Sequence, residues 1–343
     1  MNSWLARVWR KRGLAACLLW PLSQVYRVLS GFHRSLYRAE LLKTERSSVP
    51  VIVVGNVVAG GAGKTPLVIA LLQHFKRQGL EVGVVSRGYG RQSTSCVEVL
   101  ESTPISLSGD EPSLILRAQA APVFVANKRI EAVHALLAKY PATQVIISDD
   151  GLQHHSLARD IEITVFDDRG IGNGWLLPAG PLREPWSARP GLVLHTGQSP
   201  AFEGFKSTRR LADHAFNAAG HQVALSGLSG QVITALAGIA NPEAFFDMLR
   251  AHGLQLQHTI SLPDHFDFSG YAWPASKDSV VLCTEKDAVK LFKLPQFKGH
   301  NLLAVPLEFS PQPAFLAAVD ALLAPLLSKS SELPSPHEHN NGH

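Results

Sequence analysis

Residues 51–66 read VIVVGNVVAGGAGKTP, and this stretch decides the fold. The run 51–56 is rich in β-branched residues and is typical of a buried parallel strand. A glycine-rich turn follows, and residues 65–78 have the apolar spacing of a helix. A strand, a glycine-rich turn and a helix in this order predict a phosphate-binding loop.

The loop has a composition suited to holding a nucleotide. Its glycines allow backbone amides to turn toward an anion, Lys64 is expected to reach the β and γ phosphates, and the Thr65 hydroxyl is expected to ligate Mg²⁺. The strict pattern GxxxxGK[ST] is not met, because Val58 stands at the first glycine position. A chance glycine-rich turn is the alternative, and the flanking strand and helix favour nucleotide binding. The predicted nucleotide-binding residues are Val58, Ala59, Gly60, Gly61, Ala62, Gly63, Lys64 and Thr65.

The rest of the chain alternates strand-like and helical patterns, which predicts an α/β fold with a parallel sheet covered by helices. A Rossmann-like nucleotide domain is expected over 48–222 and a smaller α/β domain over 223–328. Residues 329–343 are expected to be a disordered tail. Further predicted strands are 81–86, 123–126, 144–148, 161–166, 232–238, 279–283 and 302–306, and further predicted helices are 129–139, 242–252 and 314–327.

Length and composition agree with two globular domains. The chain has 343 residues, of which 45% are hydrophobic and 17% charged, against roughly 25% charged in typical globular proteins. Disorder throughout is therefore excluded. Three widely spaced cysteines give neither a disulfide framework nor a zinc pattern, so a reducing compartment is expected.

Charge is concentrated at the N-terminus. Residues 1–47 hold nine Lys and Arg against two Glu, a net charge of +7, and the remaining chain carries −3 because the whole chain carries +4. A basic end on a mildly acidic body indicates a local anionic contact and argues against a nucleic-acid-binding surface.

The segment 1–47 is predicted to associate with a membrane surface. Its apolar part, 13–26, is shorter than the about 20 residues that a spanning helix needs, and it contains Pro21. Leucines recur there at helical spacing between arginines, which favours an amphipathic helix on anionic lipid. A core helix with a solvated basic face is the alternative.

Acidic residues suggest where a metal would bind. Residues 145–150, VIISDD, form an apolar strand that ends in Asp149 and Asp150, the arrangement in which a carboxylate holds Mg²⁺ near a phosphate loop. Capping of the next turn is the alternative. Arg183 and Glu184 lie in the proline-rich loop 178–185 and suit phosphate and metal respectively, or form a surface ion pair.

Two segments offer a general base. Asp110 lies in SGDEP (108–112), where it also suits the N-cap of a helix, and His265 lies in LPDHF (262–266) beside a carboxylate. Residue types alone leave the choice between these segments open.

Taken in order, the motifs resemble those of the tetraacyldisaccharide 4′-kinase family along nearly the whole chain. They are WPLSQVYRVL (20–29), VGNVVAGGAGKTP (54–66), SRGYGR (86–91), SGDEP (108–112), SDDGLQH (148–154), GNGWLLPAGPLREP (172–185), LAGIANPEAFF (236–246), LPDHF (262–266) and TEKDAVKL (284–291). The resemblance implies transfer of the γ-phosphoryl group of ATP to the 4′-hydroxyl of a tetraacyldisaccharide 1-phosphate, giving lipid IVA. It also implies a peripheral, monomeric enzyme at the cytoplasmic face of the inner membrane.

The resemblance also implies site roles. Asp110 and His265 together are expected to activate the acceptor hydroxyl, while Lys64 and Arg183 bind phosphate. The roles of Arg87, Glu285 and Lys286, and the division of labour between Asp149 and Asp150, stay open. The residues implied on the Mg²⁺ side are Thr65, Asp149, Asp150 and Glu184.

Two other functions compete with a kinase. A membrane-recruited ATPase switch, without a phosphorylated lipid acceptor, is disfavoured because Ala59 occupies the place of the signature lysine of such switches. A scaffold with a vestigial nucleotide fold is disfavoured by the intact Lys64, Thr65 and Asp149.

Overall fold

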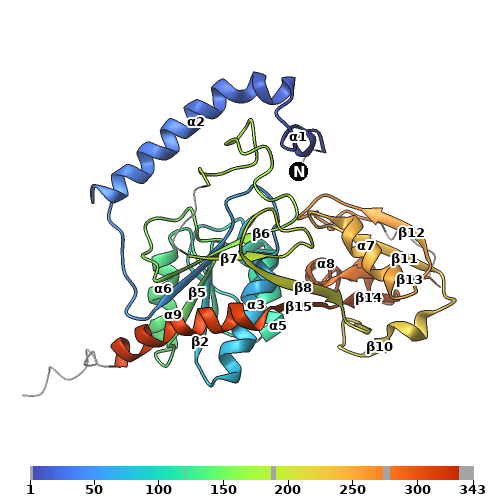
Figure 1. Ribbon diagram of the computed structural model, residues 1–343. Helices are drawn as coiled ribbons and strands as arrows, with labels where there is room; N and C mark the ends of the chain where they lie inside the picture. Colours follow the sequence, from blue (N-terminus) through green and yellow to red (C-terminus); the bar gives the residue numbers. More distant parts are fainter. Residues whose placement is uncertain (1–2, 120, 187–190, 273–278, 332–343) are drawn as a thin grey trace, which may run out of the picture.

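The computed structural model describes residues 3–119, 121–186, 191–272 and 279–331, and its strands form two sheets (Figure 1). The larger sheet contains, in spatial order, β15 (Leu307–Pro311), β8 (Phe205–Leu211), β7 (Leu192–His195), β6 (Ile161–Phe166), β1 (Val51–Gly55), β5 (Val145–Asp149), β2 (Val82–Ser86), β4 (Val123–Val125) and β3 (Val97–Glu98). The smaller sheet contains β10 (Gln222–Ala224), β9 (His214–Phe216), β14 (Leu302–Val305), β13 (Val280–Thr284), β11 (Ile233–Ala237) and β12 (Leu256–Ser261).

Strand β1 lies inside the larger sheet, as its β-branched sequence predicts. All five of its residues are buried, and it pairs in parallel with β5 and β6. Where β1 pairs with β5, Val54 lies opposite Asp149. The loop after β1 and the carboxylates at the end of β5 therefore lie at the same edge of the sheet.

Helices cover both faces of the larger sheet. Ile52 and Val54 belong to one core with residues of α3 (Lys64–Arg77), α5 (Asp110–Gln119) and α9 (Pro313–Ser331). Val51 and Val53 belong to the opposite core with α6 (Arg129–Lys139). The predicted parallel α/β nucleotide fold is confirmed. A short helix, α4 (Ile105–Ser108), precedes α5.

The smaller sheet is likewise enclosed. Helix α7 (Pro242–Ala251) contributes Phe245 and Phe246 to the core on one face, and α8 (Glu285–Leu291) contributes Ala288 and Leu291 to the core on the other. Two 3₁₀ helices, η1 (Leu225–Leu228) and η2 (Pro295–Phe297), also contribute residues to these cores.

The sheets divide the chain at residues other than the predicted boundary at 222. Strands β9 and β10 already belong to the smaller sheet, so the changeover falls between β8 and β9. The chain then returns, because β15 pairs antiparallel with β8 and α9 packs Phe315, Val319 and Leu323 into the core of the nucleotide unit. A unit 223–328 therefore does not coincide with one sheet. Of the predicted tail, residues 329–331 lie in α9 and the remainder lies outside the described residues.

The N-terminal segment forms α1 (Ser3–Val8) and the long helix α2 (Leu14–Arg38), which runs along one side of the molecule (Figure 1). Its buried residues are Ala16 and Ser23, and the Ser23 hydroxyl donates to the Leu176 carbonyl at 3.0 Å. The helix continues past Pro21. Among the described residues, no helix has both the length and the apolarity needed to cross a membrane.

Candidate active site

The phosphate loop is held in shape by a side chain that follows β1. The Asn56 amide donates to the carbonyls of Val58, at 2.7 Å, and Gly60, at 3.0 Å. Gly63 takes the left-handed conformation, with φ of 84°, immediately before α3 begins at Lys64. Such a φ favours glycine, and it directs the chain into the helix whose N-terminus faces the loop.

Side-chain donors hold the loop from outside. The Arg169 guanidinium donates to the carbonyls of Ala59, at 3.3 Å, and Gly61, at 2.7 Å. The Thr196 hydroxyl donates to the Ala62 carbonyl at 2.9 Å. The Ala59 amide donates to the Pro181 carbonyl at 2.8 Å, so the amides of residues 60–63 are the ones that suit an anion.

Lys64 and Thr65 begin α3 and are both nearly buried. The Lys64 ammonium lies 3.5 Å from the Asp150 carboxylate and 3.3 Å from the Asn56 amide oxygen. The predicted phosphate-binding lysine is therefore within reach of the loop, and its charge is balanced by a residue at the end of β5.

Asp149 is fully buried, and within the described part of the chain neither of its carboxylate oxygens has a hydrogen-bond partner. Burial, reinforced by the charge of Glu111, raises its pKa to about 7. A buried carboxylate without donors is costly on its own. The residues therefore fit a bound cation, since Mg²⁺ prefers one or two carboxylates together with substrate phosphates.

Asp150 has a different environment. Its φ is 49°, and its carboxylate lies 3.3 and 3.4 Å from the Arg183 guanidinium. Burial alone would raise its pKa, but the charges of Lys64, Arg183 and Arg129 outweigh burial and lower the pKa. The two neighbouring carboxylates thus differ: one lacks donors and the other is paired with cations.

Arg183 and Glu184 are part of one polar network with Gln153. The Gln153 amide nitrogen donates to Glu184 at 3.0 Å and to the Asn56 carbonyl at 3.1 Å, and its oxygen accepts from Arg183 at 3.2 Å. Glu184 is buried and also pairs with Arg34 of α2 at 3.3 Å. Its predicted metal role stays a prediction, because these contacts place it in the phosphate network.

Arg129 belongs to the site, although only its place at the start of a predicted helix could have drawn attention to it. It is 4% exposed, and its guanidinium donates to the carbonyls of Asp150, at 2.8 Å, and Asp149, at 3.4 Å. These bonds fix the backbone at the end of β5. Arg87 is an exposed neighbour whose charge acts on Arg129.

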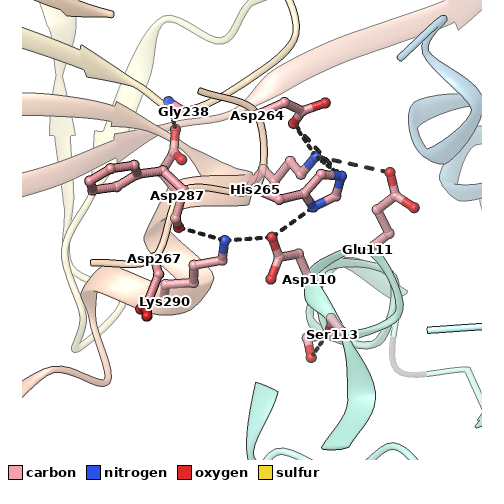
Figure 2. Close-up of polar contacts among 12 residues, drawn as sticks. Asp110, Glu111, Ser113, Gly238, Asp264, His265, Asp267, Asp287 and Lys290 are labelled. Atoms are coloured by element: carbon pink, nitrogen blue, oxygen red, sulfur yellow. Dashed lines mark hydrogen bonds and ion pairs between the residues drawn. The ribbon is translucent and has the colours of Figure 1, made fainter. Parts of the chain in front are cut away.

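A second group of polar residues, which we call the Asp110 cluster, joins the two units (Figure 2). It consists of Asp110, Glu111, Asp264, His265, Lys286 and Lys290. Asp110, the first residue of α5, accepts from His265 Nδ1 at 3.1 Å and pairs with Lys290 Nζ of α8 at 2.6 Å. His265 has φ of 61°, and its ring lies 5.2 Å from that of Tyr89. Burial would raise the pKa of Asp110, but His265 and Lys290 outweigh it and lower the pKa. The sequence left Asp110 and His265 as alternatives, and the structure brings them together.

Lys286 is surrounded by carboxylates. Its ammonium lies 2.7 Å from Asp264 and 3.9 Å from Glu111. Burial would lower the pKa of Lys286, but these carboxylates raise it. Glu285, by contrast, accepts the Leu307 backbone N–H at 3.0 Å and is a structural residue outside the cluster.

The phosphate loop and the Asp110 cluster are adjacent. A β-carbon at Gly61 would lie 3.2 Å from the Ala240 β-carbon and 4.0 Å from the Asp264 carboxylate. Glu111, next to Asp110, also acts electrostatically on Asp149. The loop therefore lies beside the carboxylates of this cluster, an arrangement that suits phosphoryl transfer to a hydroxyl.

Fold and site together define a phosphotransferase of the P-loop class. The family model for tetraacyldisaccharide-1-P 4′-kinase matches residues 15–324. The chain is 62% identical to the tetraacyldisaccharide 4′-kinase of Polaromonas naphthalenivorans over 99% of both chains, and 53% identical to that of Acidovorax ebreus over 94% of this chain and 95% of the relative. It therefore belongs to the tetraacyldisaccharide 4′-kinase family.

A solved structure agrees with this assignment. LpxK of Aquifex aeolicus, crystallised in complex with ATP, superimposes with a TM-score of 0.78 at 28% identity and covers 92% of this chain and 100% of its own. The predicted kinase activity, with ATP as donor and the lipid A disaccharide 1-phosphate as acceptor, is confirmed at the level of the family. The ATPase-switch alternative is not supported.

Proposed function

We propose that Asp110 is the base of this lipid kinase and that His265 orients it. In the reaction the acceptor's 4′-oxygen bonds to the γ-phosphorus, the bond from that phosphorus to the β–γ bridging oxygen breaks, and ADP leaves. The hydroxyl proton passes to Asp110 late in the transfer. The observation that carries this proposal is the Asp110 carboxylate, ionised and fixed by His265 and Lys290 beside the phosphate loop.

The phosphate side is assigned to the loop amides, Lys64 and Arg183. Thr65 and Asp149 would hold Mg²⁺, which offsets the charge of the phosphates. Asp150 has a separate role, because it pairs with Lys64 and Arg183 and holds both cations at the loop. Little covalent chemistry is needed, since alignment and charge neutralisation supply most of the acceleration.

The test is transfer of label from γ-labelled ATP to tetraacyldisaccharide 1-phosphate in detergent micelles with Mg²⁺. Asp110→Ala should lower turnover by about a hundredfold or more while ATP affinity stays within about twofold, because the residue acts on the acceptor. Asp247→Ala, which removes an exposed carboxylate from α7, is the control and should leave both unchanged. An equal loss of ATP affinity in Asp110→Ala would contradict the assignment.

We further propose that α2 attaches the enzyme to the cytoplasmic face of the inner membrane, where ATP is available and the acceptor's acyl chains lie. Large apolar side chains at three- and four-residue spacing form one exposed face of this helix, which we call the α2 apolar face. It consists of Leu14, Leu18, Leu22, Val25, Leu29 and Phe32. Arg7, Arg10 and Lys11 precede it and supply positive charge for anionic headgroups.

Vesicle co-sedimentation tests the attachment. Leu18→Glu should weaken binding to phosphatidylglycerol-containing vesicles about tenfold or more. Leu322→Glu, a change of an exposed leucine in α9, should not weaken it. Equal binding by Leu18→Glu and the parent would contradict the proposal.

We infer that the kinase acts as a monomer, because the loop, the β5 carboxylates and the Asp110 cluster all come from one chain. Sedimentation in detergent, with activity measured at the same protein concentrations, tests this. Specific activity that rises with an increase in mass would contradict it.

A further inference from the structure

Helix α2 does more than display an apolar face, because its other side contacts the residues that flank the phosphate site. The Tyr26 hydroxyl donates to the Arg183 carbonyl at 2.8 Å. Two turns further along the helix, the Arg34 guanidinium pairs with Glu184 at 3.3 Å. Both contacts join residues more than 140 positions apart in sequence, so they depend on the docked position of α2.

The contacts continue inward as one connected network. Glu184 accepts from Gln153 at 3.0 Å, and Gln153 accepts from Arg183 at 3.2 Å. Gln153 also donates to the Asn56 carbonyl, and the Asn56 side chain accepts from Lys64 at 3.3 Å. A shift of Glu184 would therefore move Gln153, and through Gln153 it would reach Arg183 and Lys64, the two cations on the phosphate side.

Burial makes the Arg34–Glu184 ion pair sensitive to the positions of its two side chains. The Glu184 side chain is 3% exposed and that of Arg34 is 22% exposed. Water therefore screens this pair poorly, and the carboxylate is best stabilised where the Arg34 charge and the Gln153 amide both reach it. The Tyr26 bond also holds the backbone of Arg183, whose guanidinium pairs with Asp150.

From this network we propose that Tyr26 and Arg34 are positioning residues for the nucleotide site, which makes docked α2 part of the frame that holds Arg183 and Lys64. The inference rests on the proposed phosphate role of Arg183. It implies that a helix exposed to the bilayer also sets the affinity for ATP, so that attachment and nucleotide binding are linked through the same element.

The test is Mg·ATP binding by the full chain in detergent, with no lipid acceptor and no vesicles. Arg34→Ala should weaken ATP binding about tenfold, and Tyr26→Phe, which keeps the ring and loses only the hydroxyl, should weaken it about threefold. Arg34→Lys should recover most of the affinity. Arg27→Ala removes the same charge from an exposed position of α2 and should leave the affinity unchanged.

The kinetic constants separate positioning from lipid binding. Positioning predicts a raised KM for ATP and a lowered kcat, with an unchanged KM for the lipid. Thermal unfolding of each variant shows whether the fold is kept. If Arg34→Ala does not fold, Tyr26→Phe still tests the inference. If a folded Arg34→Ala and Tyr26→Phe both keep the parent's ATP affinity while Arg183→Ala binds ATP more weakly, the inference is overturned and the phosphate role of Arg183 stands. Unchanged affinity in Arg183→Ala as well would overturn both its phosphate role and the inference.

Discussion

The ammonium of Lys290 lies 2.6 Å from the carboxylate of Asp110 (Figure 2). Lys290 belongs to α8, which packs on the smaller sheet, and Asp110 belongs to α5, which packs on the larger sheet. Helix α8 is fixed at its start, because Asp287 accepts the Gly238 N–H at 3.0 Å and Thr284 caps the helix through the Asp287 N–H. The position of Lys290 is thus set by the smaller unit, and it stabilises the ionised form of a carboxylate in the larger one.

Replacing Lys290 should move the acid limb of activity. Burial favours the neutral form of Asp110, and Lys290 with His265 opposes burial and holds the pKa below its usual value. Lys290→Met would leave burial less opposed, so the pKa should rise and activity should be lost at a higher pH than in the parent. The pH profile of kcat/KM for the lipid measures this, with Lys290→Arg as the charge-conserving control. A parental acid limb in Lys290→Met would contradict it.

Asp149 should make stability depend on pH and on Mg²⁺. Its folded pKa of about 7 lies above the usual aspartate value, so its contribution to stability is fully present at low pH and is lost as pH rises through about 7. Without Mg²⁺ and nucleotide, Asp149→Asn should therefore melt above the parent at pH 8 by about a few degrees and equal to it at pH 4. Addition of Mg·ATP should reverse the order at pH 8, since only the parent carboxylate can bind the ion. Thermal unfolding at pH 4 and pH 8, with and without Mg·ATP, checks both parts. If Asp149→Asn still melts above the parent at pH 8 in Mg·ATP, the result would argue against Asp149 as a metal ligand.

Lys64→Ala should remove most of the affinity for ATP, by about a hundredfold, because its nearly buried ammonium lies at the start of α3 beside the loop. Lys76→Ala changes an exposed lysine of the same helix and should bind ATP like the parent. Binding of a fluorescent ATP analogue measures the difference. Retained affinity in Lys64→Ala would show that the loop amides and Arg183 hold the phosphates without it.

Local patterns predicted the elements that place the phosphate site. The strand, loop and helix around Lys64 and the carboxylates at the end of β5 were predictable because each depends on residues that are close in sequence: buried β-branched runs, a glycine turn and a helix N-terminus. Strand β6 and helix α6 have the predicted bounds for the same reason.

Contacts between distant segments were not predictable in this way. Strand β8, FKSTRRL, is mostly polar, and it forms a strand because β15 pairs with it about a hundred residues later. The pairing of Arg183 with Asp150, the bonds from Arg129 and the ion pair of Lys290 likewise exist only once the chain has folded. The sequence identified the residue types of the site, and the tertiary fold determines which of them meet.

The two ends of α3 offer a matched pair of glycines for separating backbone strain from loop damage. Gly63 and Gly79 have φ of 84° and 77°, so alanine is strained by a similar amount at both, about 1 kcal/mol. At Gly79 a β-carbon would meet none of the described residues within 4 Å, whereas at Gly63 it would overlap the Arg209 guanidinium, which reaches the Ala62 carbonyl at 3.4 Å.

Both alanine variants should therefore lose a similar, small amount of stability from strain, but only Gly63→Ala must also displace the Arg209 guanidinium from the Ala62 carbonyl of the loop. We expect Gly79→Ala to bind ATP like the parent and Gly63→Ala to bind it at least about tenfold more weakly. Denaturant unfolding and ATP titration of the two variants check this. If Gly63→Ala kept the parent's affinity, the loop would have to tolerate movement of Arg209, and the conformation of Gly63 would not be required for phosphate binding.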